Sequence, residues 1–156
     1  GQTQFLLKLD KFFDEGHYWH GNEPGHQVPF MFAMAGRPDK TQRWTQTILK
    51  EEYGTGPGGL SGNEDAGQMS AWLVFAMMGF YPVCPASNEY VITTPAFDEV
   101  RIVVPGRNTF LISCLDRPSG TAYIAATTRN GARYYDWYIT HDDIVKGNRF
   151  TFYLTR

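Results

Sequence analysis

The chain has 156 residues, of which 42% are hydrophobic and 15% aromatic, so it can bury a core as one compact domain or as two small units sharing an interface. Charged residues make up only 19% of the sequence, which argues against a disordered tail. The net charge of −2 gives no strong basic field and argues against nucleic acid as the main partner.

The first half of the sequence, up to Pro82, carries apolar residues at helical spacing and is expected to be mainly helical. Four helices are predicted, at residues 4–13, 30–35, 38–53 and 64–78. Pro38 suits the first position of the third helix, and Asn63 can cap the fourth, whose first turn would then hold two acids. The fourth helix is apolar nearly all round, which predicts burial on several sides.

The second half alternates β-branched and aromatic residues in short runs that turn residues interrupt, a pattern typical of strands. The predicted strands are residues 90–93, 100–104, 109–115, 122–127, 134–140 and 149–154. Pro105-Gly106 and Asn130-Gly131 are turn signals, and the Asn-Gly pair predicts a hairpin. Because sequential strands with short connections pair antiparallel, we expect an α+β fold with helices at 1–82 and an antiparallel β region at 83–156.

Two further features limit the class of protein. The longest apolar stretch, from Ala71 to Tyr81, is too short to cross a bilayer, so no membrane span is expected. Cys84 and Cys114 lie 30 positions apart and could form one bridge, but they cannot form a disulfide scaffold.

The densest polar segment, residues 18–27, is expected to be a shaped loop because glycines and prolines interrupt it. It carries a carboxylate, two amides and two imidazoles beside the aromatic rings of Tyr18 and Trp19. Aromatic rings can stack on the apolar face of a sugar while polar groups bind its hydroxyls, so the loop is a candidate sugar site. The alternative is that Asn22 and Glu23 cap a helix and the aromatic residues belong to the core.

A second candidate is the glycine-rich loop at residues 58–68, which runs into the predicted fourth helix. A phosphate could bind at such a helix N-terminus, but the Walker lysine is missing and two acids would repel an anion. Glu64 and Asp65 instead suit water activation, because a helix N-terminus would lower their pKa values and keep a general base ionised. The alternative is that these acids only cap the helix.

Oxygen-bearing side chains on the two loops could also hold a hard cation such as calcium, although no EF-hand spacing is present. The carboxylates that could take part are Glu23, Glu64 and Asp65. The histidines around them are His17, His20 and His26, for which hydrogen bonding is favoured over zinc ligation. Residues 141–143 are expected to form a turn between strands, with a structural role.

Five stretches of the sequence together resemble glycoside hydrolase family 92. They are residues 21–30 (GNEPGHQVPF), 36–42 (GRPDKTQ), 62–72 (GNEDAGQMSAW), 79–85 (GFYPVCP) and 138–144 (YITHDDI). These runs are long, ordered and spread over essentially the whole chain. The resemblance implies an exo-acting α-mannosidase that inverts the anomeric centre and needs calcium. It also implies that the helices form the last part of an (α/α)6 barrel, followed by the terminal strands.

The resemblance further implies roles for individual residues. The Asn-Glu-Asp match places the general base at Asp65 or Glu64, with Asp65 favoured. The Gly-Asn-Glu-Pro match implies that Asn22 and Glu23 hold the calcium ion or the terminal mannose. The other candidates near the substrate are His26, Gln27, Gln68 and Trp19. Glu23 and the two acids of the second loop should then lie near one another.

The general acid that the family requires belongs to a Glu-Gly-Asn-x-Trp motif upstream of this region. The run from Glu15 to Trp19 resembles that motif, but its place after the first helix fits a later loop, so Glu15 is not assigned as the acid. We therefore expect the chain alone to be inactive. Its expected partners are the remainder of the parent polypeptide, including an N-terminal β-sandwich and upstream barrel helices, and an α-mannoside of N-glycans or mannans.

Two alternatives remain open at this point. The chain could be a catalytically incomplete fragment with weak calcium or sugar binding, or a carbohydrate-binding module built on its strands. A parent with the upstream glutamate would favour the mannosidase. The family implies a secreted, periplasmic or cell-envelope location, although no signal peptide opens the chain.

Overall fold

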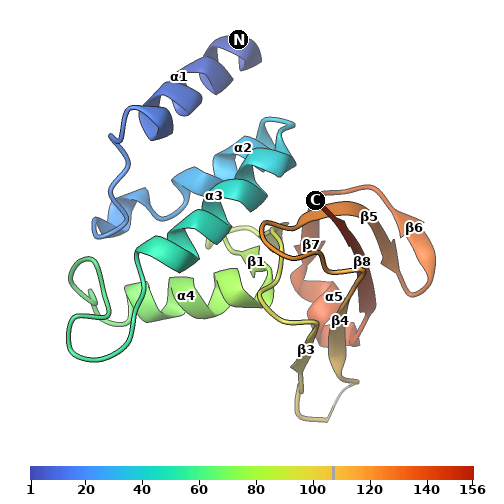
Figure 1. Ribbon diagram of the computed structural model, residues 1–156. Coiled ribbons are helices and arrows are strands. Elements are labelled where there is room, and N and C mark those ends of the chain that lie inside the picture. Colours follow the sequence, from blue (N-terminus) through green and yellow to red (C-terminus); the bar gives the residue numbers. More distant parts are fainter. Residues whose placement is uncertain (107) are drawn as a thin grey trace.

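Helices come first along the chain and strands follow in the computed structural model, which describes residues 1–106 and 108–156 (Figure 1). The helical half contains α1 (Gln2–Asp14), α2 (Met31–Met34), α3 (Pro38–Glu51) and α4 (Gln68–Met78), with the short 3-10 turns η1 (Glu23–Gly25) and η2 (Val28–Phe30). The first strand begins at Phe80, so the change from helix to strand falls beside Pro82, as predicted. No helix within the described ranges is long and apolar enough to cross a membrane.

The starts of α3 and α4 follow from residues with special backbone angles. Pro38 occupies the first turn of α3, as predicted, because a proline lacks the N–H that would be unpaired there. The helix α4 begins at Gln68 and not at residue 64, because Asp65, Ala66 and Gly67 have φ angles of 52°, 56° and 95° and cannot continue a right-handed helix. Its first turn therefore holds no acid, so the predicted placement of the two acids is wrong, but the backbone N–H of Ser70 in that turn still binds the Glu64 carboxylate and helps to lower its pKa, as predicted for this acid.

The strands form two sheets. In the three-stranded sheet, β1 (Phe80–Tyr81), β2 (Glu89–Ile92) and β7 (Tyr138–Thr140) are adjacent in that order. The five-stranded sheet has the order β3 (Glu99–Ile102), β4 (Phe110–Leu115), β8 (Arg149–Thr155), β5 (Tyr123–Arg129) and β6 (Ala132–Tyr134). Pairing is antiparallel, as predicted, except between β4 and β8, which are parallel. Because β4 and β5 run in opposite directions, the strand between them must be parallel to one of the two.

Three local predictions in this half have different outcomes. Asn130 and Gly131 have φ angles of 51° and 82° and form the predicted hairpin between β5 and β6. The strand predicted at residues 134–140 is divided between β6 and β7, which belong to different sheets. The turn predicted at residues 141–143 is wrong: these residues begin the helix α5 (His141–Lys146) because Thr140 and Asp143 form a capping box.

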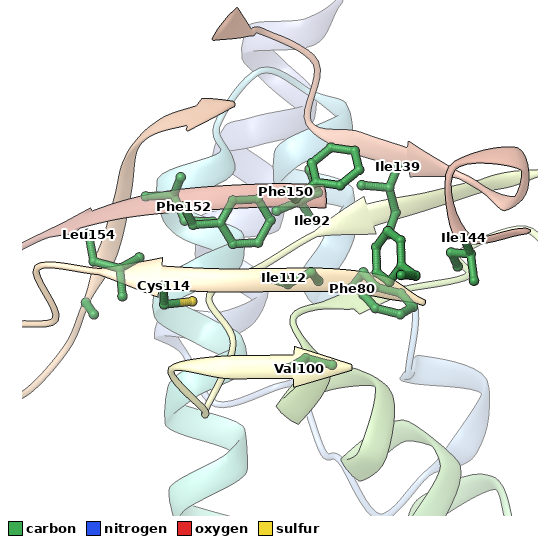
Figure 2. Packing of buried hydrophobic residues seen from close by; sticks show 13 residues of the cluster. Phe80, Ile92, Val100, Ile112, Cys114, Ile139, Ile144, Phe150, Phe152 and Leu154 are labelled. Carbon is green, nitrogen blue, oxygen red and sulfur yellow. The ribbon is translucent and has the colours of Figure 1, made fainter. Parts of the chain in front are cut away.

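Two buried apolar clusters are joined by α4. The larger cluster is filled by side chains of both sheets, such as Phe80, Ile139 and Phe150 (Figure 2). A second cluster lies between the helices and the strands β1 and β2, and it includes Trp72. Phe75 of α4 packs against both clusters, which explains why this helix is apolar nearly all round.

Two glutamines one turn apart on α3 attach the helices to the strands. The side-chain amide of Gln46 accepts a hydrogen bond from the Ala122 N–H at 3.0 Å and donates one to the Ala122 carbonyl at 2.9 Å. The side-chain oxygen of Gln42 accepts from the Ile124 N–H at 2.6 Å and from the Thr94 hydroxyl at 3.0 Å. These buried bonds fix how the two halves of the chain meet.

Replacing Gln46 by alanine is expected to leave the Ala122 N–H without its side-chain partner, whereas the Ala122 carbonyl still lies 2.9 Å from the Thr94 hydroxyl. An unsatisfied buried polar group costs about 1–3 kcal/mol, so amide exchange at residues 122–124 should accelerate roughly fivefold to a hundredfold. Hydrogen exchange followed by mass spectrometry of the protein measures this. The exposed Gln4→Ala change is the control, and equal exchange in both variants would contradict the prediction.

Candidate functional site

Two loops that are distant in sequence meet through a pair of glycines. We call residues 19–27, after α1, and residues 61–68, after α3, the site loops; both lie on the side of the helices away from the sheets (Figure 1). A Cβ atom on Gly62 would stand 2.3 Å from the Gly21 carbonyl oxygen, and one on Gly21 would stand 2.7 Å from the Ser61 carbonyl oxygen. Only glycine allows backbones to approach so closely. The contact brings Asn22 and Glu23 of one loop beside residues 63–65 of the other.

Behind the site loops lies the buried ring of His20, whose tautomer follows from its partners. The Tyr53 hydroxyl donates to the Met69 carbonyl at 3.0 Å and lies 2.7 Å from Nε2 of His20. A tyrosine hydroxyl has a single proton, so Nε2 of His20 must be the donor in the second bond. In the neutral ring Nδ1 then accepts from the Tyr18 hydroxyl at 2.8 Å.

His26 continues this network toward α4. Its Nε2 donates to the His20 carbonyl at 2.9 Å, and its Nδ1 accepts from the side-chain amide of Gln68 at 3.1 Å. The same Gln68 nitrogen donates to the Tyr81 hydroxyl at 3.0 Å, and the Trp72 indole N–H donates to the His26 carbonyl at 2.9 Å. Both site loops are therefore tied to one side of α4 by neutral, directional bonds.

Burial keeps both imidazoles uncharged at neutral pH. Burial, followed by the influence of His26, lowers the pKa of His20 to about 3. Burial also lowers the pKa of His26, although its bond to the His20 carbonyl and the charges of Glu23 and Asp65 oppose the shift. The two rings are stacked with centroids 4.4 Å apart, so a positive charge on both would be strongly unfavourable.

The two acids of the second site loop differ in their surroundings. The Glu64 carboxylate accepts hydrogen bonds from the Ser70 hydroxyl and backbone N–H, and these bonds lower its pKa. The Asp65 side chain is exposed, and within the described ranges it receives no hydrogen bond from another group. Its backbone φ of 52° is uncommon for a residue other than glycine, and such strained angles often mark functional positions.

The structure places the predicted substrate-binding residues in different environments. Asn22 and Glu23 are exposed at the start of η1, and Asn22 makes no side-chain capping bond there. Trp19 is 59% exposed, and its ring lies against Gly21. Gln68 is half-buried, whereas His26 is buried with both ring nitrogens bonded to groups of this chain. The charges of Glu23 and Asp65, one from each loop, both raise the pKa of His26 against the effect of burial.

Sequence analysis did not predict which residues hold these loops in place. They are Tyr18, Tyr53, Tyr81, Trp72 and Ser70. The spacing of the tyrosines in the sequence does not indicate a shared site, since each belongs to a different segment. The glycines at 21 and 62 were a usable signal, because each precedes an Asn-Glu pair and suggests a close backbone approach.

The chain offers a partial set of metal ligands. Within the described ranges, no three side chains of the types His, Cys, Asp and Glu are grouped closely enough to hold a metal ion. The side chains of Asn22 and Glu23 are exposed oxygen donors, and no hydrogen bond between them and other described groups is found. Oxygen donors of this kind suit calcium. Because calcium takes six to eight oxygen ligands, these two side chains could supply only part of its ligand set.

The fold and the paired loops can now be compared with known proteins. The chain belongs to glycosyl hydrolase family 92, whose catalytic domain matches residues 1–156. A solved family GH92 alpha-mannosidase from Bacteroides thetaiotaomicron is 36% identical with a TM-score of 0.91, and the match covers 99% of this chain and 22% of that one. A solved family GH92 inverting mannosidase from Bacteroides thetaiotaomicron VPI-5482 is 35% identical with a TM-score of 0.81, covering 96% and 20% of the two chains.

A curated relative adds to this comparison. An uncharacterized secreted glycosidase of Arthroderma benhamiae is 32% identical over 150 residues, which are 94% of this chain and 19% of that protein. The chain therefore spans about one fifth of the length of these relatives.

Replacing Gly62 by alanine is expected to push the two site loops apart, because the new Cβ would meet the backbone of Gly21 at 2.3 Å. Forced overpacking of this kind typically costs about 1–3 kcal/mol. Gly58→Ala is a matched control in the same segment, since a Cβ there meets nothing within 4 Å. Thermal unfolding of both variants tests the prediction, and equal melting temperatures would contradict it.

Acidification should weaken the fold through His20. The folded protein keeps this ring neutral down to about pH 3, whereas the unfolded chain binds a proton below about pH 6.5. The stabilisation is therefore present above about pH 6.5 and is lost as the pH falls toward 3, by at most about 1.4 kcal/mol per pH unit.

The stability difference between wild type and His20→Gln isolates this contribution from the carboxylates, which are common to both. We expect this difference to shrink as urea unfolding is measured from pH 7 to pH 4. The exposed His17→Gln variant serves as the control. A difference that does not change with pH for His20→Gln would show that the ring is not held neutral.

Proposed function

We propose that this chain is the C-terminal part of the catalytic domain of an inverting, calcium-dependent exo-α-mannosidase, acting on non-reducing α-mannosides of N-glycans or mannans. The observation that carries the proposal is the glycine contact that sets Asn22 and Glu23 beside the run Asn63 to Asp65. Membership of the family, and similarity to a solved alpha-mannosidase and to a solved inverting mannosidase of that family, support the substrate class.

Asp65 is the proposed general base. An inverting glycosidase needs a carboxylate that takes a proton from the attacking water, about 6.5–9.5 Å from the general acid. Asp65 is exposed and its carboxylate is not engaged by other described groups, so it can accept that proton. The acid would come from another part of the parent, because this chain corresponds to about one fifth of its relatives.

Asn22 and Glu23 are the proposed calcium ligands of this chain, with further oxygen ligands from the rest of the protein. When bound, calcium would polarise sugar hydroxyls and favour distortion of the ring toward an oxocarbenium-like state. Trp19, exposed beside Gly21, offers a face on which the apolar side of a sugar can stack. Gln68 and His26 hold the two loops from behind.

The helices are proposed to complete an (α/α)6 barrel with the remainder of the parent polypeptide. Large apolar side chains stay exposed on them in this chain, including Leu7 at 56%, Met34 at 65% and Val74 at 54%. Exposed apolar faces of this kind indicate an interaction with more protein. A secreted, periplasmic or cell-envelope location is proposed from the family. The rival interpretation is an incomplete fragment without activity of its own.

Release of mannose from α-1,2-mannobiose tests the proposal. The parent should be active and a chelator should silence it, while this chain alone should release none, because losing a positioned acid costs about 10²–10⁴-fold. Asp65→Asn in the parent should lower kcat far more than it changes KM, and the exposed Asp14→Asn variant is the control. Activity of the chain alone would show that it contains an acid, with Glu15 the first to examine. Insensitivity to the chelator would remove calcium from the proposal.

A further inference from the structure

Ser70, in the first turn of α4, holds the Glu64 carboxylate with two hydrogen bonds. The Ser70 backbone N–H donates to Oε1 at 2.9 Å, and the hydroxyl donates to Oε2 at 2.7 Å. Both oxygens of Glu64 are thus occupied by one residue. Asp65, its immediate neighbour, has no such partner among the described groups.

These two bonds close a turn that the backbone alone holds weakly. Between Glu64 and Ser70 the chain passes through three successive left-handed residues, at positions 65–67. Two longer backbone bonds also cross the turn, from Met69 to the Glu64 carbonyl and from Gln68 to the Asp65 carbonyl, each at 3.2 Å. Left-handed angles at Asp65 and Ala66 are unfavourable, so the turn needs added support from side chains.

We propose that Ser70 is a positioning residue. Its hydrogen bonds give Glu64 a structural role and leave Asp65 as the only acid of the pair that can act on water. This inference rests on the proposed function and assigns the roles of two adjacent acids. During hydrolysis the water oxygen would bond to the anomeric carbon as Asp65 takes its proton. The glycosidic bond would break, and the leaving oxygen would take a proton from the acid elsewhere in the parent.

The Glu64→Gln variant distinguishes a structural role of Glu64 from a role as the general base. Its side-chain oxygen can accept from the Ser70 N–H, and its amide can donate to the Ser70 hydroxyl, so both contacts survive without the charge. A general base at position 64 would lose its function in this variant, because an amide does not take a proton from water. Glu64→Gln should therefore lower kcat by less than about tenfold, against about 10²–10⁴-fold for Asp65→Asn.

Ser70 itself is tested by three variants of the full-length protein, assayed with calcium on α-1,2-mannobiose. Ser70→Ala removes the hydroxyl bond and should lower kcat roughly tenfold to a hundredfold with little change in KM, since small displacements of a reacting group have effects of this size. Ser70→Thr keeps the hydroxyl and should restore most of kcat. Ser119→Ala, at an exposed serine of the strand half, should leave both constants unchanged.

A double variant distinguishes positioning from general structural damage. If Ser70 acts through Asp65, then Ser70→Ala should cause no further loss of kcat when Asp65→Asn is already present. Melting temperatures of all variants show whether any loss reflects unfolding, and Glu64→Gln provides an independent result if Ser70→Ala does not fold.

Several outcomes would overturn the inference. They are a Glu64→Gln loss as large as that of Asp65→Asn, an unchanged kcat in Ser70→Ala, and fully additive losses in the double variant. Any of these in an active wild-type protein would leave the mannosidase assignment intact. A wild-type protein without mannosidase activity would instead overturn the proposed function, and this inference with it.

Discussion

The site depends on keeping two buried imidazoles uncharged. His20 and His26 together connect the first site loop to Tyr53 at the end of α3 and to Gln68 at the start of α4. Each ring donates through one nitrogen and accepts through the other, which only the neutral form can do. The exposed side chains of the first site loop therefore stand on a layer of the protein that is buried, aromatic and free of formal charge.

This layer also explains why α4 is central to the chain. Trp72 of α4 donates to the His26 carbonyl on its loop side, while Phe75 packs against the strand cluster as well as the helical one. A helix with such neighbours cannot be amphipathic in the ordinary sense, because more than one of its faces is covered by protein. The position of the acids before its first turn is thus set by the same packing that joins helices to strands.

Much of the fold could be predicted from local patterns, and the failures have identifiable causes. Pro38 and the Asn130-Gly131 pair act through their own backbone preferences, so sequence alone located them correctly. The start of α4 was misplaced because Asn63 followed by two acids resembles a helix cap, whereas residues 65–67 form a left-handed turn that hydrogen bonds from Ser70 to Glu64 close. The parallel position of β8 depends on strands far away in sequence, which no local pattern records.

The candidate site was predictable only in part, for a similar reason. Motifs identified both loops, since Asn22, Glu23, Glu64 and Asp65 stand in dense polar runs. They could not reveal that His26 is buried or that Tyr53 orients His20, because these facts arise where separate segments meet. The polar residues of the two loops could be identified from the sequence, whereas the residues that hold the loops in place could not.

The glutamines of α3 have a consequence for an edge of the five-stranded sheet. The strand β6 pairs with only residues 127–129 of β5, and within the described ranges no other strand pairs with the beginning of β5 on that side. Gln42 and Gln46 bind the backbone of Ala122 and Ile124 there, much as an adjoining strand would. An unpaired edge is a template on which a second molecule can add a strand. The two amide side chains of the helix therefore occupy backbone groups to which an added strand could otherwise bind.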